Sequence, residues 1–184
     1  SLFGSSYTVK DNLGVDATVA VPANVTSLVF QDLTVLLNIG TTALSIADKD
    51  LVSLLEIYVA YFNRVPDAEG LAYWIGRLKA GVSIFEIGEA FYNAALQFPD
   101  QTGYRANMSN AEFVTLIYKN ALARPVPDTE GLNYWVNDLA TGKQTKGTVV
   151  IAILVGARLS KGDPGLGFVV DLLDNKIAVA RKFA

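Results

Sequence analysis

Residues 64–74 read RVPDAEGLAYW, and residues 124–135 read RPVPDTEGLNYW. The two stretches share Arg, Pro-Asp, Glu-Gly-Leu and Tyr-Trp in the same order, and the second has one extra residue before the Pro-Asp. Both tryptophans of the chain lie in them, at positions 74 and 135. A phrase that returns after about 61 residues predicts two copies of one structural unit.

The first copy contains the signals for the end of one helix and the start of the next. Apolar residues recur at spacings of three and four from Asp48 onward, which predicts a helix. That helix should end near Arg64, because the residue before Pro66 disfavours helical geometry. Asp67 stands where an N-cap belongs, and Gly81 is placed to close the second helix.

The flanking sequence extends the same pattern in both copies. Ser83 with Glu86, and Ser109 with Glu112, have the spacing of capping boxes. Each copy therefore predicts about three helices, over about 48–98 in repeat 1 and about 109–159 in repeat 2. The pair Asp163-Pro164 predicts the start of a C-terminal helix over about 163–183.

The first 45 residues have a different pattern. The segment 17–22 alternates as a strand does, and 28–30 and 33–37 predict a hairpin that Gly40 ends. No stretch before about Ser45 predicts a helix. The predicted fold is mainly α, a helical bundle of two tandem pseudo-symmetric three-helix repeats (46–184). The short N-terminal β-hairpin segment (1–45) is expected to dock on this bundle, since a lone hairpin is marginally stable.

Composition removes several classes of function. The chain has 184 residues, 51% of them hydrophobic and 18% charged, which indicates a globular protein. There is no Cys and no His, which excludes Cys nucleophiles, His bases, imidazole or thiolate metal sites and disulfides. The net charge of −3 and the lack of a basic run argue against a nucleic-acid partner. The longest apolar stretch is too short to cross a membrane, so we expect no transmembrane segment.

A structural role is predicted for most of the repeated phrase. Arg64 and Arg124 can bond to free helix carbonyls or to the nearby aspartate. Other residues of the phrase would serve as helix caps, close-contact glycines and core aromatics. We call these residues the structural signature: Asp67, Gly70, Trp74, Asp128, Gly131 and Trp135.

Ligand binding is the alternative role for the exposed part of the phrase. Tyr73 and Tyr134 point off the Leu/Trp face, so they are candidates for stacking on sugar rings, with Arg64 and Arg124 beside them. The acidic pairs of each copy lie within one cap, whereas glycosidases place two carboxylates across a cleft. Calcium needs six or more oxygens, which the phrase does not supply. We therefore expect no catalytic residues, no metal site and no cofactor.

The pattern R-x-P-D-x-x-G-L-x-x-W resembles that of a bacterial domain of unknown function found, often in tandem, in RTX-type secreted proteins, adhesins and surface-layer proteins. The first copy matches directly, and the second matches with one inserted residue. The resemblance covers roughly 25–157, and the helical unit is also similar to the phycobilisome linker domain. It implies an exported or cell-surface location and no established catalysis. The chain lacks the G-G-x-G-x-D repeats of full RTX proteins.

Two functional hypotheses follow. The first is a non-catalytic secreted or cell-surface module that serves adhesion, anchoring or assembly by binding a surface polysaccharide or another surface protein, with self-assembly as a further alternative. The second is a carbohydrate-active accessory or enzyme domain that uses the Asp/Glu and Tyr/Trp pairs of the repeats.

Overall fold

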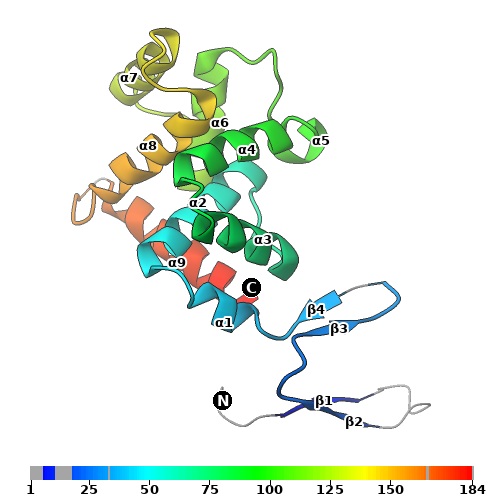
Figure 1. Ribbon diagram of the computed structural model, residues 1–184. Helices are drawn as coiled ribbons and strands as arrows, with labels where there is room; N and C mark the ends of the chain where they lie inside the picture. The colour runs from blue at the N-terminus through cyan, green and yellow to red at the C-terminus, as the bar shows by residue number, and fades with distance from the viewer. Residues whose placement is uncertain (1–5, 11–17, 33, 165, 184) are drawn as a thin grey trace.

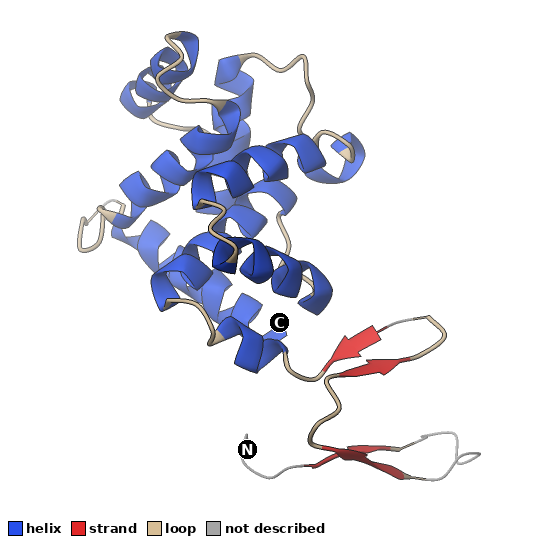
Figure 2. Ribbon diagram, in the orientation of Figure 1, coloured by secondary structure: helices blue, strands red, loops and turns tan. Residues whose placement is uncertain are grey.

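The computed structural model describes residues 6–10, 18–32, 34–164 and 166–183. Within them the chain is mainly helical, with two short antiparallel strand pairs near the N-terminus (Figure 1, Figure 2). The elements in chain order are β1 (Ser6–Val9), β2 (Val19–Pro22), β3 (Ser27–Val29), β4 (Thr34–Leu36), α1 (Ile39–Ala43), α2 (Asp48–Phe62), α3 (Ala68–Lys79), α4 (Ile84–Ala95), α5 (Pro99–Thr102), α6 (Asn110–Leu122), α7 (Thr129–Ala140), α8 (Lys146–Arg158) and α9 (Gly167–Phe183).

The N-terminal segment forms two separate hairpins, one more than the pattern predicts. β1 pairs with β2, with Tyr7 opposite Val21, and β3 pairs with β4. The predicted strands are present at Val19–Pro22, Ser27–Val29 and Thr34–Leu36, whereas Ala17 and Leu33 lie outside the described residues. β1 was not predicted, because four residues are too few to show a period.

The hairpins extend from one end of the helical bundle (Figure 1). Leu36 packs against the helical core, and the Tyr7 hydroxyl donates a hydrogen bond to the Leu37 carbonyl at 3.1 Å. Val21 is buried, but Val29 is 78% exposed. Docking of the whole 1–45 segment on the bundle stays a prediction.

The expectation of no helix before Ser45 was wrong. α1 covers Ile39–Ala43, and Gly40 lies inside it instead of ending a strand. Ile39 is buried, and α1 packs against α3. Burial of the helix therefore outweighs the weak helix propensity of its Gly-Thr-Thr sequence.

The helix boundaries of both copies agree with the local signals. Asp67 and Asp128 cap α3 and α7, and capping boxes start α4 and α6. α5 was not predicted. The last helix begins at Gly167, not near Asp163, because the Asp163 carboxylate accepts a hydrogen bond from the Leu166 amide within a turn that precedes the helix.

The core lies around α2, α4, α6 and α8 (Figure 1). Its largest fully buried side chains are Tyr61, Tyr104, Phe91 and Phe113. The Tyr61 hydroxyl donates to the Lys146 carbonyl at 2.8 Å, which satisfies a polar group inside the core. α4 and α8 cross closely at two glycines, 88 and 147. Among the described residues, no helix combines the length and hydropathy required to span a bilayer.

Candidate functional site

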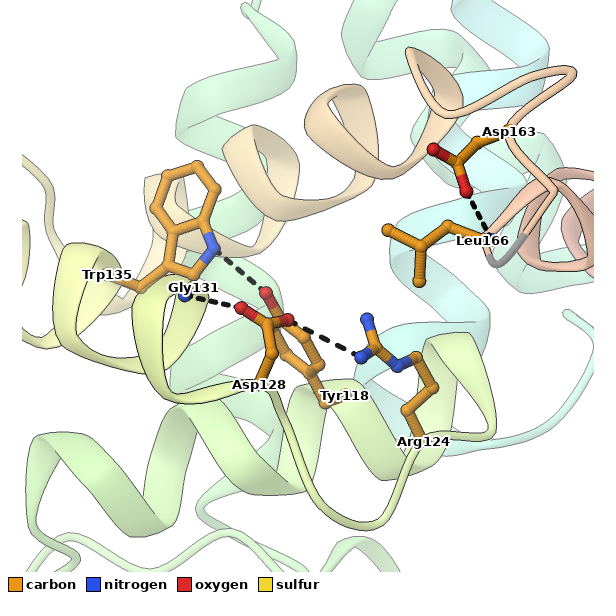
Figure 3. Close-up of polar contacts among 7 residues, drawn as sticks. All are labelled: Tyr118, Arg124, Asp128, Gly131, Trp135, Asp163 and Leu166. Atoms are coloured by element: carbon orange, nitrogen blue, oxygen red, sulfur yellow. Dashed lines mark hydrogen bonds and ion pairs between the residues drawn. The ribbon is translucent and has the colours of Figure 1, made fainter.

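The second copy of the phrase forms a compact network at the junction of α6 and α7 (Figure 3). The Asp128 carboxylate accepts a hydrogen bond from the Gly131 amide at 2.7 Å and pairs with Arg124 at 3.4 Å. The Trp135 indole donates to the Tyr118 hydroxyl at 3.2 Å. That hydroxyl would lie 2.9 Å from a Cβ on residue 131, so only glycine fits there without a shift.

The first copy has the same contacts. The Asp67 carboxylate accepts from the Gly70 amide at 2.7 Å and lies 3.5 Å from Arg64. The Tyr58 hydroxyl would lie 2.5 Å from a Cβ on Gly70. Burial raises the pKa of Tyr58 to about 12, and a hydrogen bond with the Trp74 side chain opposes the rise. At both signature glycines the close neighbour is thus a tyrosine hydroxyl.

The two arginines fold back toward the helix that precedes them. Each follows a residue in the left-handed conformation, Asn63 with φ 48° and Ala123 with φ 52°. The guanidinium carbon of Arg124 lies 5.7 Å from the centre of the Tyr118 ring, and that of Arg64 lies 5.8 Å from the ring of Phe62. Both distances fit a cation–π contact. The left-handed residue is thus what turns the arginine over an aromatic ring.

A cavity lies beside each network. The first-copy cavity has a volume of about 390 Å³ and is lined by Tyr58, Phe62, Arg64, Trp74, Phe91, Ala94, Phe98, Gln101 and Thr102. The second-copy cavity has a volume of about 120 Å³ and is lined by Tyr118, Leu122, Arg124, Asp128, Trp135, Ile153, Gly156, Ala157, Ser160, Leu166 and Val169.

Many of these lining residues correspond in sequence. The pairs Tyr58/Tyr118 and Arg64/Arg124 are 60 residues apart, and Trp74/Trp135 are 61 apart. Three further pairs are 62 residues apart: Phe91/Ile153 and Ala94/Gly156 in α4 and α8, and Phe98/Ser160 just after those helices. Corresponding positions of the two copies therefore contribute to both cavities, although α3 packs mainly on α1 whereas α7 packs mainly on α6.

The predicted site residues fall into two groups. Arg64 and Arg124 line the cavities. Trp74 and Trp135 were expected in the core, but both are half-buried and form cavity walls. Tyr73 and Tyr134 are 58% and 51% exposed, as predicted, and do not line the cavities.

Each exposed tyrosine contacts the tryptophan that follows it. The Tyr73 and Trp74 rings meet edge to face with centres 4.9 Å apart, and the Tyr134 and Trp135 rings do so at 4.7 Å. The Lys143 ammonium lies 5.1 Å from the Tyr134 ring centre. Tyr134 is therefore partly covered by a cation, whereas Tyr73 has the freer face.

The tyrosine partners of the glycines were not identified from the sequence as site residues. Tyr58 and Tyr118 each stand six residues before the arginine of their copy. This constant spacing is the signal that could have found them. The third-helix residues Phe91 and Ile153 carry no comparable signal, because they reach the site through packing between helices.

The two cavities differ in the polar groups that line them. The larger cavity offers aromatic faces and one guanidinium. Asp67, which is not part of its lining, serves as a cap and an ion-pair partner. Hydrogen bonding to Gly131 lowers the pKa of Asp128, which keeps that carboxylate ionised as a cap. In the described part of the chain, no three acidic residues cluster closely enough to hold a metal ion.

Comparison with known proteins identifies one family match. Residues 97–157 match the model of a domain of unknown function, DUF4214. This segment includes the second copy of the phrase, from Arg124 to Trp135, and it confirms the expectation of a domain of unknown function there. No curated protein and no solved structure matches the chain.

Proposed function

We propose that this chain is a non-catalytic binding module of a bacterial secreted or cell-surface protein, serving adhesion, anchoring or assembly. The observation that carries the proposal is the first-copy cavity of about 390 Å³, walled by aromatic rings with Arg64 among them. A volume of this size, mostly apolar with a few polar groups, is typical of ligand sites. Its ligand belongs to a cell-surface polysaccharide or to another surface protein, a second copy of the chain included.

The tandem arrangement is part of the proposal. We take the two copies as pseudo-symmetric three-helix units, supported by the matching caps, the matching tyrosine–glycine contacts and the corresponding cavity residues. The surface location is supported by the resemblance of the repeated phrase. The non-catalytic role is supported by the engagement of Asp67 and Asp128 as caps and arginine partners.

The test is binding of the full chain to an array of bacterial surface polysaccharides and to immobilised surface-protein fractions, with calcium present and absent. Ala94→Leu adds a side chain inside the larger cavity and should abolish binding, whereas Tyr73→Ser changes an exposed residue outside it and should not. If Tyr73→Ser abolishes binding and Ala94→Leu does not, the binding site lies on the exposed tyrosine face and not in the cavity. Release of reducing ends from a polysaccharide would overturn the proposal in favour of an enzyme.

A further inference from the structure

The two cavities differ about threefold in volume, and the lining of the smaller one includes a leucine from the turn before α9, Leu166. Figure 3 shows its side chain directed toward the space between Trp135 and Arg124. Leu166 and Tyr104 are 62 residues apart, the same interval that relates the third-helix residues of the two copies. Tyr104 does not line the larger cavity.

A tight turn holds Leu166 at the second-copy cavity. The Leu166 amide donates to the Asp163 carboxylate at 2.8 Å, and the Gly167 amide donates to the Asp163 carbonyl at 2.8 Å. Gly162 enters this turn with φ 84°, a conformation that favours glycine. The chain therefore presents its own aliphatic side chain to the aromatic and arginine wall.

Tyr104 is held elsewhere in the first copy. It is fully buried, and its hydroxyl donates to the Ala60 carbonyl at 2.8 Å. Its ring packs 5.4 Å from both the Tyr61 and Phe113 ring centres. Phe98, Gln101 and Thr102, from the segment before Tyr104, line the larger cavity, and among the described residues no leucine lines it.

We propose that the first-copy cavity binds a branched aliphatic side chain, leucine in shape, presented by a turn segment of a partner polypeptide. The inference rests on the proposed function and narrows its ligand from glycan or protein to polypeptide. The second copy provides the internal precedent, because there a leucine of the chain itself lines the corresponding cavity.

The lining of the larger cavity favours this occupant over a sugar. Phe91, Ala94 and Phe98 form an apolar wall, and the Thr102 hydroxyl already bonds the Ala95 carbonyl, whereas the polar side chains of the lining are those of Tyr58, Arg64, Trp74 and Gln101. A sugar hydroxyl turned toward the apolar wall would lose water without a replacement partner.

The charge at the cavity favours an acidic neighbour in the partner segment. The Arg64 side chain is 59% exposed, whereas that of Arg124 is 22% exposed. Arg64 therefore keeps donors that can reach a carboxylate of the ligand.

The two tryptophans provide one reporter for each cavity. In a two-dimensional NMR spectrum of the ¹⁵N-labelled full chain, the two indole N–H signals are assigned with Trp74→Phe and Trp135→Phe. The probe is the synthetic peptide LSKGDPGLGF, which has the sequence of residues 159–168. We expect saturable shifts of the Trp74 indole signal and none of the Trp135 signal. A peptide with Ala in place of the Leu166 equivalent should bind at least about tenfold more weakly, as loss of a buried leucine side chain implies.

Two protein variants complete the experiment. Ala94→Leu should abolish the shift at Trp74, and Leu166→Ala should open the second cavity so that the Trp135 signal responds as well. A Trp74 shift that survives Ala94→Leu, an Ala peptide that binds equally well, or no shift at millimolar peptide would overturn the inference. If the peptide fails but an array polysaccharide shifts Trp74, the binding function holds and only the polypeptide ligand is rejected; if both fail, the cavity is not a binding site.

Discussion

The Tyr118 hydroxyl oxygen lies where a Cβ on Gly131 would come within 2.9 Å of it. The same hydroxyl accepts the hydrogen bond from the Trp135 indole, so the glycine, the tyrosine and the tryptophan of the second copy depend on one another. The glycine is needed because a polar group from the preceding helix takes the space of a side chain.

Substitution of the signature glycines should destabilise the fold. We expect Gly131→Ala to lower the free energy of unfolding by about 1–3 kcal/mol, as overpacking does, and Gly70→Ala to act in the same direction. Gly76→Ala is the matched control, because Gly76 lies within α3 with nothing near its Cβ position. It should stabilise by about 0.5–1 kcal/mol. Denaturant melts check all three, and a Gly131→Ala protein as stable as Gly76→Ala would contradict the close contact.

The left-handed residue before Arg124 is a point of strain. Ala123 has φ 52° and is exposed, and this conformation costs a residue with a Cβ about 1–2 kcal/mol. Ala123→Gly should therefore stabilise the protein by about 0.5–1 kcal/mol after the greater entropy of glycine is counted. Ala178→Gly makes the same change at an exposed position inside α9 and should destabilise by about 1 kcal/mol. In thermal melts the two variants should change the melting temperature in opposite directions, up for Ala123→Gly and down for Ala178→Gly. If both variants lose stability, Ala123 is not strained.

A buried ion pair predicts a pH dependence. Glu56 in α2 accepts from Arg158 in α8 at 2.6 Å, and Arg158 also pairs with Asp174 in α9 at 2.9 Å. Burial raises the pKa of Glu56 above its ordinary 4.5, although Arg158 opposes the rise. The folded state therefore holds the proton to higher pH than the unfolded chain. The resulting stability is fully present below pH 4.5 and is lost as pH rises through the raised pKa.

Glu56→Gln should remove this dependence of the unfolding free energy on pH. Relative to the Gln variant, the natural protein should lose unfolding free energy as pH rises above 4.5. Asp128→Asn should change the pH dependence in the opposite direction. The lowered pKa of the Asp128 carboxyl gives the natural protein stability that is present above its ordinary pKa of 3.8 and is lost as pH falls through the lowered pKa. Urea melts across the acid range measure both differences. A Glu56→Gln difference that grows with pH in favour of the natural protein would contradict the dominance of burial.

The sequence predicted those features of the fold that depend on residues close together in the chain, such as helix starts. The starts of α3 and α7 follow from Asp67 and Asp128, since a cap bonds an amide three residues on. α1 was missed because burial of Ile39 comes from packing on α3, which no local pattern records. The cavities were missed for the same reason, since Phe91 and Trp74 meet across helices at 4.8 Å between ring centres.

The crossing of α4 and α8 leads to the last prediction. A Cβ on Gly88 would lie 2.7 Å from the Gly147 carbonyl oxygen, and a Cβ on Gly147 would lie 2.6 Å from the Glu89 amide nitrogen. These are backbone atoms, so relief requires the helices to separate, and we expect each Ala variant to lose about 1–3 kcal/mol or more of unfolding free energy. Gly156→Ala, in the same helix as Gly147, would meet only Trp135 at an ordinary 3.7 Å and should gain about 0.5–1 kcal/mol. Denaturant melts separate the cases, and a Gly147→Ala protein that is stabilised like Gly156→Ala would mean that the two helices do not touch there.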